Sequence, residues 1–129
     1  MYKKLFPTDA HPQGAARKIF FRANSSQEIN KFSAWLQTKL TQEEQKSLYN
    51  LFRVCCSHKD VCLHHSPEKF KKEFDEIYVL KSFQVRLYGF LKDRNFIIFY
   101  YMKKKKNKLT KDEKEIIKKK YEECKSEND

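Results

Sequence analysis

Residues 83–102 read FQVRLYGFLKDRNFIIFYYM and carry the clearest structural signal in the chain. In the first half, Phe83, Val85 and Leu87 alternate with polar or amphipathic residues, which is typical of a strand with one face in the core. From position 96 the stretch is almost wholly apolar, as expected of a central strand. The intervening KDRN has the composition of a hairpin turn. The stretch therefore predicts two antiparallel strands.

A strand and a helical hairpin are expected before this region. Residues 17–23, RKIFFRA, have the composition of a strand, and a polar NSS segment ends it. Two capping boxes follow, Ser25 with Glu28 and Thr41 with Glu44, and each is a start signal for a helix. Behind them, apolar residues recur at helical spacing, namely Ile29, Phe32, Leu36 and Leu40, then Leu48, Leu51, Phe52 and Cys55. Two amphipathic helices with almost no loop between them predict a helical hairpin.

Further elements are expected on both sides of residues 83–102. Residues 57–66 read as a loop, and Ser66-Pro67 can open a short helix that carries Phe70 and Phe74. Residues 77–81 predict a short strand. A third capping box, Thr110 with Glu113, opens a last helix, whose apolar face holds Ile117, Tyr121 and Cys124.

The predicted fold class is α+β: a small antiparallel-rich sheet with an N-terminal helical hairpin and a C-terminal helix. Residues 1–16 are expected to form a flexible lead-in, residues 17–125 a single domain, and residues 126–129 a tail. No second domain or internal repeat is expected in a chain of 129 residues with this pattern.

The chain is strongly basic, with 28 Lys and Arg against 17 Asp and Glu and a net charge of +11. Residues 92–125 hold 13 basic and 6 acidic groups, so 13 − 6 = +7 of that charge lies there. A polyanion is the expected partner, RNA or DNA ahead of a membrane surface. No apolar run is long enough to span a membrane and no signal peptide is recognised, so a cytoplasmic location with reduced cysteine thiols is expected.

Four ordered motifs between Lys69 and Cys124 resemble the RelE/HigB-type toxins of toxin–antitoxin systems. They are FDEIYVLK at 74–81, FQVRLYGF at 83–90, the apolar strand that ends in lysines at 96–106, and the Lys- and Glu-rich helix at 110–121. The phage-derived, HigB-like branch of the RelE/ParE superfamily is the most similar. The resemblance implies that residues 17–125 form a RelE-like toxin domain.

What the resemblance implies is a metal-independent, ribosome-dependent mRNA endonuclease that inhibits translation and needs no cofactor. Its partners would be mRNA on the ribosome and a cognate antitoxin protein. In such enzymes the RNA 2′-hydroxyl attacks the adjacent phosphate. The protein supplies alignment, proton transfer and cations for the developing charge.

Six residues are the candidates for the reaction. Arg86 matches the family's strand arginine, and strand alternation allows its side chain to face solvent or a partner instead of the core. Lys81 matches the basic residue that ends the preceding strand. Lys103 and Lys104 match the family's lysine pair, and alternation puts one of the two on the Arg86 face. Tyr88 and Tyr100 can stack on bases, transfer protons or serve as core residues.

Other residues are candidates for binding or proton transfer. The exposed lysines expected to contact nucleic acid are Lys71, Lys72, Lys105, Lys106 and Lys108. His64 and His65, in the predicted loop, are candidates for acid–base roles. Cysteines and histidines crowd between positions 55 and 65, but their spacing matches no zinc finger or knuckle, so no metal site is predicted.

Two other functions stay open at this point. The first is a non-catalytic basic nucleic-acid-binding module or regulator on the same fold, since no acid–base residue is certain. The second is a relative that poisons gyrase. Retention of Lys81, Arg86 and the lysine pair favours the endonuclease.

Overall fold

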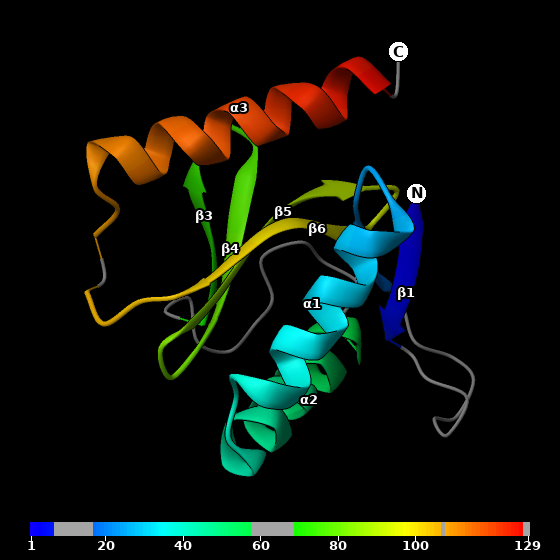
Figure 1. Cartoon of the computed structure of the whole chain (residues 1–129), viewed down its shortest axis with the longest axis vertical. Helices are drawn as coiled ribbons and strands as arrows, with labels where there is room; N and C mark the ends of the chain where they lie inside the picture. Colours follow the sequence, from blue (N-terminus) through cyan, green and yellow to red (C-terminus); the bar gives the residue numbers. More distant parts are fainter. Residues whose placement is uncertain (7–16, 58–68, 107, 128–129) are drawn as a thin grey trace.

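A computed structural model of the protein describes residues 1–6, 17–57, 69–106 and 108–127, and it places helices on both faces of a six-stranded sheet (Figure 1). The strands are β1 (Tyr2–Phe6), β2 (Ile19–Arg22), β3 (Phe70–Phe74), β4 (Ile77–Ser82), β5 (Val85–Lys92) and β6 (Asn95–Lys103). The helices are α1 (Ser26–Thr38), α2 (Gln42–Ser57) and α3 (Lys111–Glu127). The strand order is β1-β2-β6-β5-β4-β3, and all neighbours are antiparallel except β2 and β6, which are parallel.

Three of the predicted helix starts and the predicted β-hairpin are confirmed. Glu44 Nα donates to Thr41 Oγ1 at 3.1 Å and Glu113 Nα donates to Thr110 Oγ1 at 3.1 Å, so both residues cap as expected. Ser25 is the N-cap of α1. In the β5–β6 hairpin, Lys92 pairs with Asn95, and both residues between them have positive φ. Two such residues make the tight turn whose twist suits a hairpin.

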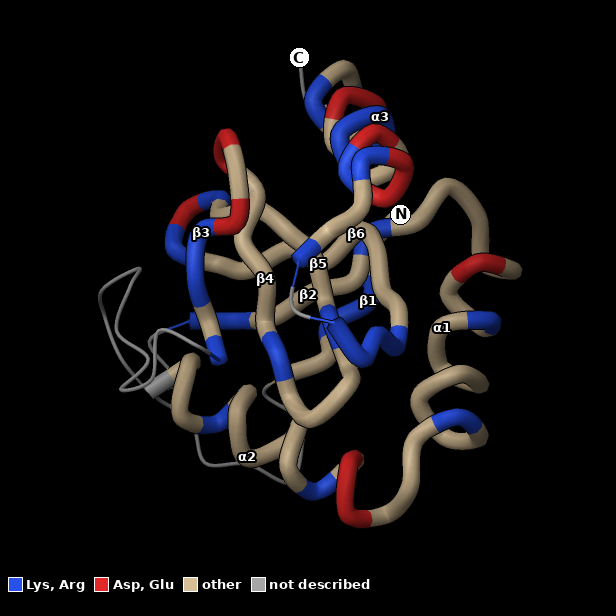
Figure 2. Tube along the Cα trace, turned by 90° about the vertical axis from the view of Figure 1, so that its left-hand side faces the viewer, with Lys and Arg blue, Asp and Glu red and all other residues tan. Residues whose placement is uncertain are grey.

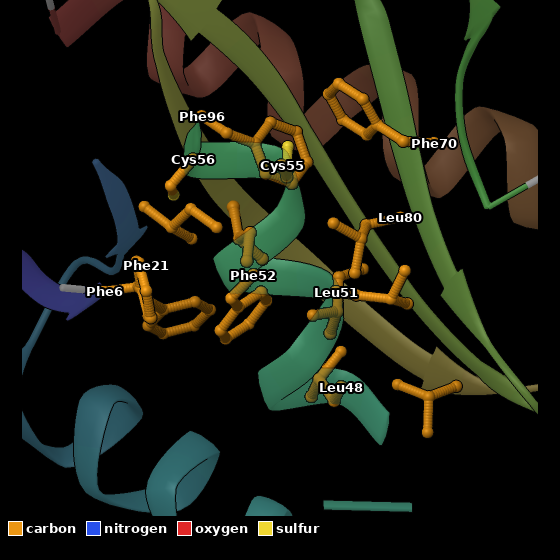
Figure 3. Close-up of a cluster of buried hydrophobic side chains, with 14 of the residues drawn as sticks. Phe6, Phe21, Leu48, Leu51, Phe52, Cys55, Cys56, Phe70, Leu80 and Phe96 are labelled. Carbon is orange, nitrogen blue, oxygen red and sulfur yellow. The ribbon is translucent and has the colours of Figure 1, made fainter. Parts of the chain in front are cut away.

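The two faces of the sheet carry separate cores. We call the face under α1 and α2 the hairpin face, which includes Phe32, Leu48, Leu80 and Phe96 among its buried residues. Figure 3 shows α2 side chains meeting side chains of the strands in this core. We call the opposite face the α3 face; it is filled by Ile77, Val79, Tyr88, Phe90, Ile97 and Phe99 from the strands and by Ile117, Tyr121 and Cys124 from α3.

The prediction of a small antiparallel-rich sheet in a RelE-like layout is wrong. The fold is α+β, but the sheet has six strands, contains a parallel pair, and begins with two strands before the helical hairpin. One added strand, β1, falls in the segment predicted to be a lead-in. It pairs with β2 and buries Phe6 in the hairpin face, which fixes it to the sheet.

The other added strand, β3, replaces a predicted helix. Phe70 and Phe74 are four residues apart, which suggested one face of a helix. Instead they lie on opposite faces of the sheet, Phe70 in the hairpin-face core and Phe74 against the α3-face core. A shift in the β3–β4 register between Lys72 and Phe74 explains this, because an irregularity in the pairing reverses strand alternation.

Candidate nucleic-acid interface

Five of the predicted residues converge on the α3 face. Lys81 lies opposite Arg86 in the β4–β5 pair, and Tyr88 lies opposite Tyr100 in the β5–β6 pair. The two tyrosine rings are 6.2 Å apart. Lys104 follows β6 and reaches Glu113 of α3. We call Lys81, Arg86, Tyr88, Tyr100 and Lys104 the candidate site.

An irregularity in β6 decides which lysine of the predicted pair joins this site. Tyr88 pairs with Tyr100 and Gly89 with Ile98, so Phe99 is an extra residue in β6. Such a bulge reverses the alternation that Phe96 begins. Lys104 consequently lies toward α3, and its Nζ is 2.7 Å from Glu113 Oε1. Lys103 lies on the hairpin face, where its Nζ donates to the Lys39 carbonyl at 2.8 Å and to Glu44 at 3.1 Å.

Arg86 is more enclosed than its sequence pattern suggests. Only 4% of the residue is exposed, and its guanidinium donates to the Phe83 carbonyl at 2.6 Å and the Val85 carbonyl at 3.0 Å. The first of these bonds holds the β4–β5 turn, where Phe83 has a positive φ of 54°. Phe83 itself is 61% exposed and does not share the core position of Val85, contrary to the alternation pattern. Arg86 therefore supports the turn as well as facing the site.

A pocket of about 460 Å³ opens beside Lys81 and Arg86. Its lining residues are Ser47, Lys69, Lys71, Lys81, Ser82, Phe83 and Arg86, which include four cations and no carboxylate. The two serine hydroxyls are 2.8 Å apart. Figure 2 shows the basic residues along β3 and β4 that contribute to this edge. Hydroxyls and cations without acids among them suit a phosphate group.

The cations of this pocket are crowded. Burial lowers the pKa of Lys81, and the neighbouring charge of Lys71 lowers it further, although Glu73 acts in the opposite direction. Lys71 also lies 3.8 Å from Glu73. The positive charges of Lys71 and Lys81 repel each other. A bound anion would reduce this repulsion. The lowered pKa also means that Lys81 gives up its proton more readily than an ordinary lysine does.

The two tyrosines are neutral groups at physiological pH. Tyr88 is 2% exposed, and burial, followed by the charge of Glu73, raises its pKa well above the usual value. Burial and then Glu113 raise the pKa of the half-buried Tyr100. A neutral phenol donates a hydrogen bond, and the raised pKa makes it a weaker proton donor than an ordinary tyrosine, although a leaving alkoxide is basic enough to take its proton.

Sequence reasoning missed three residues of the pocket, Lys69, Ser47 and Ser82. Lys69 is next to Lys81 because Lys81 Nα donates to the Lys69 carbonyl at 2.7 Å, a contact that depends on the unpredicted β3. Ser47 comes from α2, and the sequence holds no signal that links it to β4.

Several predicted residues lie elsewhere or are not described. Lys72 is 3.7 Å from Glu76 at the β3–β4 turn, and it does not line the pocket. Lys105, Lys106 and Lys108 are exposed after β6. His64 and His65 lie outside the described residues.

The described cysteines are core residues. Cys55, Cys56 and Cys124 are buried free thiols. Burial raises the pKa of Cys56 to about 12, so this thiol stays protonated. Within the four described segments, no group of three or more His, Cys, Asp or Glu residues is placed to hold a metal ion.

Comparison with known proteins adds no family. The chain matches no protein-family model, and no curated protein matches it either. Among the described helices, none is long and apolar enough to cross a membrane.

Proposed function

We propose that this protein is a metal-independent endoribonuclease that cuts mRNA during translation in the cytoplasm, as the toxin of a toxin–antitoxin module. The observation that carries the proposal is the convergence of Lys81, Arg86 and Lys104 with two tyrosines beside a cationic pocket. Cations support cleavage by positioning a phosphate and stabilising its added charge. Action on the ribosome, and silencing by an antitoxin, follow from the resemblance of residues 69–124.

In the proposed reaction, an RNA phosphate occupies the pocket beside Lys81 and Arg86. The neighbouring 2′-oxygen attacks phosphorus, the new O2′–P bond forms, and the P–O5′ bond breaks. The fraction of the protein in which Lys81 is deprotonated, which the lowered pKa enlarges, takes the 2′-hydroxyl proton. The Tyr100 phenol gives a proton to the leaving 5′-oxygen. The products are a 2′,3′-cyclic phosphate and a 5′-hydroxyl, and proton exchange with water restores both side chains.

The test is a cell-free translation reaction with a reporter mRNA, followed by primer extension to locate any cut. We expect the wild-type protein to stop translation and to cut the mRNA that is bound to ribosomes. Lys81→Met should slow cleavage on the order of a hundredfold, as expected when a proton-transfer group is lost. Lys103→Met is the matched control, because Lys103 lies on the opposite face and should leave the rate unchanged.

A second function is favoured by one specific observation. Tyr88 and Arg86 are only 2% and 4% exposed, which limits access to reacting atoms. A non-catalytic nucleic-acid-binding module would need the exposed lysines but not these groups. Tight RNA binding by the wild-type protein with no cut in mRNA, on or off the ribosome, would establish that alternative and refute the endonuclease.

A further inference from the structure

A second hollow of about 560 Å³ lies on the other side of Tyr100, between α1 and α3. It exists because β2 pairs with β6 only from Phe96 to Ile98 and then turns away into α1. Beyond Ile98, no described strand pairs with β6 on that side. Helices α1 and α3, which cover opposite faces of the sheet, flank this part of β6 (Figures 1 and 2). We call this hollow the aromatic groove.

Half-buried aromatic rings line the aromatic groove. Trp35 comes from α1, and Tyr100 and Tyr101 come from β6. The Trp35 and Tyr101 rings pack at 4.7 Å with their planes tilted by 50°, so they form one connected aromatic surface. Burial raises the pKa of Tyr101, which keeps its hydroxyl protonated and able to donate. Aromatic platforms of this kind stack on the bases of single-stranded nucleic acids.

The charges around the aromatic groove are mostly positive. Four cations, Arg22, Lys31, Lys39 and Lys120, line it against two carboxylates, Glu28 and Glu123, a balance of 4 − 2 = +2. Lys31 and Lys39 are exposed, so they remain available to phosphates. Lysines at the rim of an aromatic platform match the alternation of phosphate and base along a single strand.

Tyr100 connects the aromatic groove to the candidate site. It lines the groove, and its ring also lies 6.2 Å from that of Tyr88, the neighbour of Arg86 on the same sheet face. A strand of RNA with one phosphate in the cationic pocket could therefore continue past Tyr100. We propose that the aromatic groove is a nucleobase subsite for single-stranded RNA, with Trp35 and Tyr101 as the stacking surface. The choice of RNA as ligand rests on the proposed function.

Trp35 is the chain's single tryptophan, so its fluorescence reports on the aromatic groove directly. The probe is a short single-stranded 2′-O-methyl oligoribonucleotide, which lacks the attacking hydroxyl and cannot be cut. We expect this probe to quench Trp35 emission in a saturable titration. Tripolyphosphate, which offers charge without bases, should leave the emission unchanged. Quenching by tripolyphosphate alone, or RNA binding without quenching, would overturn the proposal.

Variants make the test independent of the fluorophore. With a labelled copy of the probe, Trp35→Leu should weaken binding on the order of tenfold, because a stacking surface is lost. Trp35→Phe keeps an aromatic ring and should bind close to wild type, and so should Tyr2→Leu, which removes an exposed ring outside the groove. Thermal melting checks that each variant folds. If Trp35→Leu does not fold, the wild-type quenching still decides.

The remaining outcomes separate this inference from the proposed function. Quenching by RNA without any mRNA cleavage would keep the subsite and refute the endonuclease. If the protein cleaves mRNA but bound RNA leaves Trp35 emission unchanged, the endonuclease is supported and the nucleobase subsite is refuted. Quenching by an acidic amphipathic peptide but not by RNA would make the groove a protein-docking surface and overturn the inference.

Discussion

Lys81 carries a charge that lowers the stability of the folded protein. Burial and the charge of Lys71 lower its pKa from the ordinary value of 10.5, so the folded protein holds this proton less tightly than the unfolded chain. The protonated form is therefore destabilising at neutral pH, and the penalty disappears as the pH rises through the lowered pKa toward 10.5. A bound anion would offset this penalty, because it compensates the charge of Lys81.

We therefore expect Lys81→Met to be at least as stable as wild type at pH 7. Its free energy of unfolding should lie no more than about 0.5 kcal/mol below that of wild type. The gap should close as the pH rises toward 10, because the wild-type penalty is then lost. Thermal melting across this pH range checks the sign. Added tripolyphosphate should stabilise wild type more than the variant. A variant that melts clearly below wild type at pH 7 would mean that Lys81 is a structural residue.

The candidate site was partly predictable at this scale. Alternation along one strand places Arg86 and Tyr88 on the same face, and the structure agrees. Alternation alone does not choose between Lys103 and Lys104, because the choice depends on the extra residue Phe99. A bulge arises from the pairing of two strands, and no local sequence pattern in β6 predicts it.

Among the elements, the β5–β6 pair depends on Gly89. A Cβ added there would lie 2.3 Å from the Ile97 carbonyl oxygen and 2.7 Å from the Phe96 ring. Backbone cannot move aside cheaply, so we expect Gly89→Ala to destabilise the protein by about 3 kcal/mol. Chemical denaturation measures the change. A variant within about 0.5 kcal/mol of wild type would show that the pair tolerates a wider spacing.

Helix α3 is tied to the sheet through Glu113. Its carboxylate accepts from Lys104 Nζ at 2.7 Å and from Thr110 Nα at 2.8 Å. The Lys104 hydrogen bond is the main cause of its lowered pKa, followed by the Thr110 backbone. A lowered carboxyl pKa gives stability that is present above the ordinary value of 4.5 and is lost as the pH falls through the lower folded value.

We expect Glu113→Gln to lose about 1 kcal/mol of stability at pH 7, because glutamine can keep the backbone hydrogen bond of the capping box but not the charge that pairs with Lys104. The deficit should shrink as the pH falls below 4.5, because the wild-type carboxylate is then protonated too. Denaturation at pH 7 and pH 3 compares the two proteins. Glu115→Gln, on an exposed position of the same helix, is the control and should stay near wild type at both pH values. If Glu113→Gln lost the same free energy of unfolding at pH 7 and at pH 3, the charge of Glu113 would make no contribution to stability.

The helices and strands that the sequence predicts correctly are those with local sequence signals. The capping boxes of all three helices and the β5–β6 turn are local signals, and each was confirmed. Strands β1 and β3 were not predictable, because their short sequences become strands only by pairing with β2 and β4. The four-residue spacing of Phe70 and Phe74 is typical of a helix, although the segment is a strand. These edge strands enlarge the sheet beyond the predicted layout.

At the scale of the whole molecule, two cationic regions flank the candidate site. Four cations, Lys81 among them, line the cationic pocket, and the lysines Lys31, Lys39 and Lys120 line the aromatic groove. The net charge of +11 supports attraction of RNA from a distance, whereas these two regions would contact it directly. A single strand releases condensed counterions from its own phosphates wherever they meet these cations. The salt dependence of its affinity therefore measures whether it contacts one region or both.

Affinity for a single-stranded RNA should therefore fall steeply with salt. Ion pairs between RNA and the four pocket cations predict a slope of about −3 in log affinity against log salt concentration, and three more ion pairs with the groove lysines predict about −5. Replacing Lys31, Lys39 and Lys120 together by Gln should move the slope from the second value to the first. Replacing Lys111, Lys118 and Lys119, exposed lysines of α3 that do not line either region, should leave it unchanged. Equal slopes for the groove variant and wild type would mean that bound RNA stops at the pocket, and a slope near zero would refute the electrostatic basis of binding altogether.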